Sequence, residues 1–209
     1  VRSGYKLFGN RLNTAGSILR IHTFHRPIRD DEVLMRQRDT TLEYYHTGTL
    51  QWETVPISGS IASGIKLGLI NFTSLTDTID YVYYCDGSTL PLQRWNGAFT
   101  QLNGALVGAE GTITVDSTTG FTATGSIDIG GTTVTYTGKT ATTFTGCVGT
   151  PAAADNLAVE QIADNFSASS GTKPSGNIMA ILNGQLVVAS KQFVKISDTN
   201  DFTNWGTGL

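Results

Sequence analysis

The sequence predicts an all-β protein built from repeated antiparallel units. Threonine, whose branched Cβ suits a pleated strand, is heavily used in the 209 residues, and residues that favour helices are sparse. Short apolar runs of strand length alternate with turn-forming residues. A unit of short strands and a closing tryptophan occurs three times, twice in a looser form. We therefore expect propeller-like antiparallel blades, partial or open, that carry an inserted small β-barrel or sandwich module.

The first unit ends at Trp52. Its predicted strands are residues 18–24, 32–38 and 41–46, and each is followed by residues typical of turns. The third strand is rich in aromatic residues, and the turn at 47–49 leads the chain to the tryptophan.

The second unit repeats this order. Its predicted strands are residues 69–73 and 80–85, and Trp95 and Phe99 complete it. Asp86-Gly87 predicts a two-residue hairpin turn after the second of these strands. The spacing of roughly 50 residues between the first and second units is the period at which propeller blades recur.

The third unit is the clearest. Its predicted strands are residues 178–182, 186–189 and 193–196, and Asn183-Gly184 is a strong signal for a two-residue hairpin. A cluster of turn-forming residues at 197–201 then precedes Trp205. The distance from the second unit is about twice the blade period, so a blade-sized segment lies between them.

That intervening segment differs in composition. Residues 111–150 are roughly a third threonine with almost no charge, which indicates a separate module. Strands are predicted at 112–115, 126–129, 132–137 and 143–147, with Gly130-Gly131 as a tight hairpin and a further strand at 157–162. The predicted buried face comprises Ile113, Val115, Phe121, Ile127, Ile129, Val134, Tyr136 and Phe144. We expect the boundaries 1–108 for the first blades, 109–163 for the module and 164–209 for the last blade.

Basic residues gather in the first fifth of the chain. Arg26, Arg29 and Arg36 could form a basic patch that meets an acidic partner, or they could be solvated strand edges neutralised by nearby acids. The net charge of −3 argues against a dedicated nucleic-acid binder. No apolar run approaches the roughly 20 residues of a membrane helix, so we expect no membrane partner.

No catalytic motif is present, and we expect neither an enzyme nor a cofactor. His22 and His25 have a helical metal-ligand spacing, but on a strand they point to opposite faces. Residues 30–32 form an acidic run that suits acid–base chemistry or a solvated turn. Cys85 and Cys147 lie in different modules, so we expect neither a disulfide nor a metal cluster.

Two further features have both a ligand-binding and a structural interpretation. The turn from Ser197 and Asp198 to residue 201 could bind calcium through oxygens or could hydrogen-bond its own backbone, and we favour the latter. The aromatic residues could form a sugar-binding platform or pack the blades, and again we favour packing. These aromatic residues are Trp52, Trp95, Trp205, Tyr44, Tyr45, Tyr83 and Tyr84.

Several motifs resemble one family. NGQLVVAS at 183–190, followed by ISDTNDFTNW at 196–205, resembles the blade ending of structural proteins of tailed bacteriophages, in propeller-like domains of the neck, tail or tail hub. VRSGY at 1–5 is similar to the stretch that opens this propeller region. YVYYCDG at 81–87 with RWNG at 94–97 is similar to another blade segment, and the threonine-rich insert looks like a β module of phage tail proteins.

The resemblance implies a structural component of the phage virion, at the neck, tail or baseplate, assembled in the cytoplasm of the bacterial host. Its partners would be other virion proteins and further copies of itself in a ring or tail. The residues expected to carry the blade motifs are Trp52, Trp95, Trp205, Asp86, Gly87, Ser197 and Asp198. Three units are fewer than the four of a closed propeller, so we expect a fragment, an open arc or closure with other chains.

One alternative belongs to a different class. A carbohydrate-binding propeller, either a receptor-binding module or a sialidase-like domain, would use the same scaffold with a glycan as its partner. A neck protein that touches DNA through the arginine-rich first unit is a further alternative.

Overall fold

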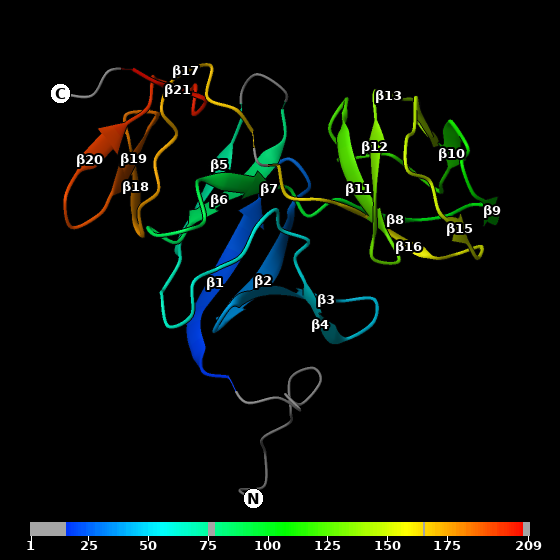
Figure 1. Ribbon diagram of the computed structural model, residues 1–209, viewed down its shortest axis with the longest axis horizontal. Helices are drawn as coiled ribbons and strands as arrows, with labels where there is room; N and C mark the ends of the chain where they lie inside the picture. Colours follow the sequence, from blue (N-terminus) through cyan, green and yellow to red (C-terminus); the bar gives the residue numbers. More distant parts are fainter. Residues whose placement is uncertain (1–15, 75–77, 165, 207–209) are drawn as a thin grey trace, which may run out of the picture.

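The computed structural model describes residues 16–74, 78–164 and 166–206, and these contain strands and no helix (Figure 1). The strands form several small sheets, nearly all antiparallel. The all-β prediction is confirmed, whereas the propeller arrangement stays a prediction. Within the described ranges, no helix has the length and apolar character needed to cross a membrane. The motif at 1–5 lies outside the described residues.

The first sheet contains the first predicted unit. It consists of β1 (Ile18–Arg26), β2 (Asp31–Arg38), β3 (Thr41–His46) and β4 (Gln51–Thr54), paired in that order. The three predicted strands are confirmed. Trp52, which was expected to follow the last turn, instead lies within the fourth strand opposite Tyr45.

The second sheet consists of β5 (Gly68–Thr73), β6 (Asp80–Cys85) and β7 (Gln93–Trp95). Every residue of β6 is buried, so this strand is covered on both faces. The predicted two-residue hairpin at Asp86-Gly87 is wrong, because a longer loop, 86–92, separates β6 from β7. The Asp86 carboxylate accepts hydrogen bonds from the amides of Ser88 and Leu90, and these bonds stabilise the longer loop in place of a two-residue turn.

The third sheet consists of β18 (Ile178–Leu182), β19 (Gln185–Ala189) and β20 (Val194–Ile196). The hairpin at Asn183-Gly184 is confirmed, with positive φ angles of 49° and 75° at its two residues, as this turn requires. Close by, β17 (Ser170–Gly171) and β21 (Asn204–Trp205) form a parallel pair.

These three sheets stack as layers, with the second sheet in the middle. Val82 and Tyr84 face a core shared with Phe24 and Met35 of the first sheet. The opposite face of β6 belongs to a second core, shared with the third sheet. That core includes Tyr81, Tyr83, Cys85, Leu186, Val188, Phe202 and Trp205. Because successive side chains of β6 point to opposite faces, this one strand contributes to both cores.

The threonine-rich module has its own core between small sheets. One sheet has the order β12 (Thr132–Tyr136), β11 (Gly125–Ile129), β16 (Ala158–Gln161) and β8 (Phe99–Gln101). Another has the order β10 (Thr112–Thr114), β14 (Thr143–Thr145) and β13 (Gly138–Lys139). A pair joins β15 (Ala152–Ala153) to β9 (Leu106–Val107). All eight residues predicted for the buried face lie in this one core, which confirms that prediction.

The module begins earlier than residue 109. Thr100 in β8 pairs with Val159 in β16, and Ala98 and Leu102 pack in the module core. Residues 99–107 were assigned to the preceding blades, because Phe99 was expected to complete the second unit. The pairing partner that places them in the module lies some 60 residues later in the chain.

Candidate functional site

A cavity of about 700 Å³ lies at the junction between the layered sheets and the threonine-rich module. One wall comes from residues 56–58 and Arg94, and the other from the strands around β11 and β16. The lining residues are Pro56, Ile57, Ser58, Arg94, Thr122, Thr124, Gly125, Ser126, Asp128, Thr133, Gln161, Ile162, Ala163 and Asp164.

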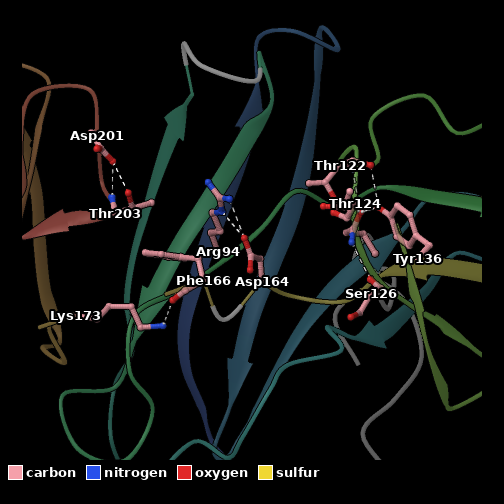
Figure 2. Close-up of polar contacts among 11 residues, drawn as sticks. Arg94, Thr122, Thr124, Ser126, Tyr136, Asp164, Phe166, Lys173, Asp201 and Thr203 are labelled. Atoms are coloured by element: carbon pink, nitrogen blue, oxygen red, sulfur yellow. Dashed lines mark hydrogen bonds and ion pairs between the residues drawn. The ribbon is translucent and has the colours of Figure 1, made fainter. Parts of the chain in front are cut away.

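Arg94 is the basic residue among those that line this cavity. Its guanidinium Nη2 lies 2.8 Å from Asp164 Oδ2 (Figure 2). The guanidinium carbon also lies 4.4 Å from the ring centre of Tyr81 and 5.3 Å from that of Phe166. The backbones of Arg94 and Asp164 also exchange hydrogen bonds of 3.1 and 2.7 Å. The two chain passages into and out of the module are therefore fastened together beside the cavity.

The module wall carries neutral hydrogen-bonding groups. The hydroxyls of Thr122 and Tyr136 lie 2.9 Å apart (Figure 2). Each also lies 3.1 Å from Gln161 Oε1. Gln161 Nε2 donates to the Ser126 carbonyl over 2.8 Å. Burial raises the pKa of Tyr136, so its hydroxyl stays neutral. Such a wall can hydrogen-bond a polar ligand or a neighbouring chain, but it holds no nucleophile activated by a base among the lining residues.

Two carboxyl groups contact one tyrosine where the first sheet meets the module. The Tyr44 hydroxyl donates to Glu53 Oε2 over 3.0 Å and also hydrogen-bonds Glu160. Burial raises the pKa of Glu160 to about 7, and the charges of Glu53 and Asp128 add to the shift. Because a hydroxyl has a single proton, it can satisfy only one carboxylate as a donor. A proton on Glu160 resolves this conflict.

A smaller hollow of about 300 Å³ lies where the first sheet meets the module. Tyr44, Tyr45 and Trp95, which were among the residues proposed for an aromatic platform, line it together with His46 and Phe99. The rings of His46 and Phe99 meet at 4.5 Å. The sequence does not indicate this contact, because His46 lies in β3 of the first sheet and Phe99 in β8 of a module sheet.

The other proposed platform residues lie elsewhere. Tyr84 belongs to the first core and Tyr83 and Trp205 to the second. Trp52 is half-buried, on the face of the first sheet that carries Arg36. The seven aromatic side chains therefore do not form one platform.

The three tryptophans do not occupy equivalent positions, contrary to our expectation. Trp95 is buried, and its Nε1 donates to the Gln161 carbonyl over 3.0 Å, which ties the second sheet to the module. Trp205 is buried beside Gly171 in the parallel pair. Trp52 instead stacks with the Arg36 guanidinium, 4.0 Å from its ring centre.

The remaining motif residues organise turns. Asp86 accepts from the amide of Ala62, besides those of its own loop, and Gly87 has a φ of 74°. Ser197 Oγ accepts from the Leu186 amide over 2.9 Å, and Asp198 Oδ2 accepts from the side chain of Asn204 over 2.6 Å. No cluster of three or more His, Cys, Asp or Glu side chains suited to a metal occurs in the described ranges.

Of the three arginines proposed for interaction, Arg26 and Arg29 lie together, since both donate to the Gly97 carbonyl, whereas Arg36 pairs with Glu43 elsewhere on the first sheet. Arg26 makes a forked ion pair with Asp31, with both contacts at 2.6 Å, and it is only 8% exposed. Arg36 is 9% exposed and pairs with Glu43 at 2.5 Å. Arg29 donates to the Gly97 carbonyl over 3.3 Å, and burial lowers its pKa. The alternative of solvated strand edges is wrong for Arg26 and Arg36, because folding buries both.

The histidines and the acidic run are separated by the strand geometry. His22 hydrogen-bonds the Asn71 side chain at 2.7 Å, whereas His25 pairs with Glu32 at 3.3 Å. They lie on opposite faces of β1, as the spacing requires. Asp31 serves the ion pair with Arg26, so the acidic run does not converge on one point.

The two cysteines are free thiols in different cores. Burial raises the pKa of Cys85 to about 12, so its thiol stays protonated near neutral pH.

Comparisons of this chain with protein families, with curated proteins and with solved structures find no match.

Proposed function

We propose that this chain is a non-enzymatic structural component of a tailed-phage virion, at the neck, tail or baseplate. The motif of the third unit supports this function through its resemblance to phage proteins. The geometric observation that carries it is a layered β scaffold that presents uncharged surfaces, on which neighbouring subunits can dock with little charge to desolvate.

The module offers one such surface. In β12, an edge strand of its sheet, the exposed positions are Thr132, Thr133 and Thr135, which alternate with the buried Val134 and Tyr136. Threonine hydroxyls can donate or accept hydrogen bonds from a neighbouring chain. The backbone of Thr135 already exchanges hydrogen bonds with Val148, so a neighbouring chain would meet this part of β12 through its threonine side chains.

The partners in this proposal are other virion proteins and further copies of the chain, assembled in the cytoplasm of the bacterial host. Antibodies against the chain would be used to label phage particles purified from the organism that carries the gene. We expect labels at one level of the neck, tail or baseplate in negative-stain images. Particles that carry no label, and no peptide of this chain by mass spectrometry, would overturn the proposal.

A glycan-binding function is the second candidate, and the small aromatic hollow favours it. Aromatic rings stack on sugar faces, and the charged Arg26, Asp31 and Glu32 beside them could orient hydroxyl groups. A glycan array would be probed with the protein and with Tyr45→Ala. Binding that this variant loses, but that Phe193→Ala in the turn before β20 keeps, would favour this function over the first.

A further inference from the structure

A separate cavity, of about 610 Å³, lies where the turn between β1 and β2 meets the module loop between β10 and β11. Its walls include Ile28, Arg29, Ile79, Thr119, Phe121 and Lys139. A cavity of this size can hold a small organic molecule. We call it the cationic cavity, because Arg29 and Lys139 both line it.

Neither cation of this cavity forms an ion pair with a described residue. The Arg29 guanidinium donates through Nη1 to the Gly97 carbonyl over 3.3 Å, and its buried Nη2 has no acceptor within the described ranges. Lys139 Nζ donates to the Thr118 carbonyl over 2.9 Å. These contacts are with neutral carbonyl groups, so they leave both positive charges without a counterion.

The one carboxylate among the described lining residues, that of Asp80, is already used by the fold. Its Oδ2 accepts from the Ile28 amide over 2.8 Å, and its Oδ1 accepts from the Thr73 hydroxyl over 2.6 Å. Asp80 is only 4% exposed, so it anchors the turn between β1 and β2. The described lining residues therefore carry two positive charges and one negative charge.

Both cations meet the same loop of the module. Arg29 Nη2 occupies the place that a Cβ at Gly120 would take, and Lys139 is anchored at Thr118, two residues earlier in this loop. The Asn96 side chain donates to the Gly120 carbonyl over 3.0 Å, which fastens the loop to the end of β7. The two charges are therefore held near one loop before any ligand binds, which lowers the cost of ordering the site.

The surroundings of the two cations disfavour their charged forms. Burial lowers the pKa of Arg29, and the positive charge of Arg26 lowers it further. Burial also lowers the pKa of Lys139. An anion in the cavity would favour both charged forms, because an opposite charge a few ångströms away stabilises a cation.

We propose that the cationic cavity binds a small organic anion whose carboxylate or phosphate group lies against Arg29 and Lys139. Hydrogen bonds between such groups and a guanidinium or ammonium are among the strong ones in proteins. Ile28 and Ile79 provide an apolar wall for the rest of the ligand. This binding site goes beyond the proposed structural role and does not rest on it.

NMR titration of the isotope-labelled protein tests the site, with benzoate, phenyl phosphate and the neutral benzyl alcohol as probes at fixed ionic strength. We expect both anions to shift the amide resonances of Gly97 and Gly120 saturably, with Kd in about the millimolar range. Benzyl alcohol should bind at least about tenfold more weakly, because it cannot neutralise the cations. The anion that binds more tightly identifies the preferred group as carboxylate or phosphate.

Charge variants locate the binding. Arg29→Gln and Lys139→Gln should each weaken anion binding at least about tenfold. Lys191→Gln, in the turn before β20, is the matched control and should leave the affinity unchanged. Tyr45→Ala should also leave it unchanged, because Arg29 lines both the cationic cavity and the small aromatic hollow, whereas Tyr45 lines only the hollow.

Dispersed amide resonances would show that each variant folds, and Lys139→Gln keeps the test decisive if Arg29→Gln unfolds. Four results would overturn the proposal: anion shifts that do not saturate, equal affinity for benzyl alcohol, anion binding that the folded charge variants retain, or anion binding that Tyr45→Ala abolishes. Labelling of phage particles tests the virion role separately, and neither result decides the other.

Discussion

Glu160 is a carboxyl group that folding makes less acidic, because burial and the nearby Glu53 and Asp128 oppose its charge. Its pKa rises from 4.5 to about 7. A group whose pKa is higher in the folded state stabilises the fold fully below its unfolded pKa. That contribution disappears as the pH rises through the folded pKa. The loss therefore falls between pH 4.5 and about 7.

We expect Glu160→Gln to remove this pH dependence. The neutral amide keeps a hydrogen-bonding group next to Tyr44 but cannot ionise. The variant should gain on the order of 2 kcal/mol relative to the natural chain between about pH 5 and about pH 8. Denaturant unfolding at both pH values measures the difference. The exposed Glu32→Gln should keep the natural dependence, and a dependence shared equally by all three proteins would contradict the assignment.

The buried Trp95 and the half-buried Trp52 should differ sharply on substitution. Trp95→Phe removes the hydrogen bond to the Gln161 carbonyl and leaves a void between the sheets, and should cost about 2–3 kcal/mol of the free energy of unfolding. Trp52→Phe should cost less than about 1 kcal/mol, because the ring is partly solvated. Chemical denaturation of both variants checks this, and equal losses would contradict the roles assigned to them.

Single-residue roles were the least predictable from the sequence. The sequence around Arg26 and Arg36 is typical of surface charges. Their neighbours in sequence do not indicate that Asp31 and Glu43 will pair with these arginines and that folding will bury them. The tie between Trp95 and Gln161 joins residues 66 positions apart. Local patterns contain no information about such partners.

At the scale of the elements, two similar dipeptides had different outcomes. Asn183-Gly184 forms the tight hairpin that it predicts, whereas Asp86-Gly87 begins a long loop. The difference lies in the aspartate side chain, which bonds amides of its own loop and the amide of Ala62 in another segment. A turn dipeptide predicts the local structure well when its side chains bond only within the turn. The prediction is weaker when a side chain also hydrogen-bonds a segment that is distant in sequence.

The layer boundary between the second and third sheets depends on a glycine at a close backbone approach. A Cβ at Gly176 would lie 2.8 Å from the Ala189 carbonyl carbon and 2.9 Å from Val188 Cγ1. We expect Gly176→Ala to cost about 1–3 kcal/mol, because the backbone of β19 would have to move. At Gly111 an added Cβ meets nothing within 4 Å, so Gly111→Ala should be nearly neutral. Thermal unfolding of the two variants checks this, and similar melting temperatures would contradict it.

At the scale of the whole molecule, the threonine-rich module has a complete core of its own. Its aliphatic and aromatic residues, from Ala98 to Val159, contact one another rather than the stack. We expect residues 97–162 produced alone to fold, with the dispersed amide resonances of a β protein. A spectrum typical of an unfolded chain would show that the module needs the junction with Arg94 and Asp164 to hold its ends together.

The sequence by itself determined most of the longer strands, the hairpins at Asn183 and Gly130, and the core face of the module. These features depend on alternation and turn residues within a few positions of each other. Only the tertiary structure decided that the second sheet is the middle layer, that β8 joins the module and that Arg26 and Arg36 are buried. Each of these depends on which surfaces meet after the chain has folded, and a residue's neighbours in sequence do not specify its neighbours across a layer.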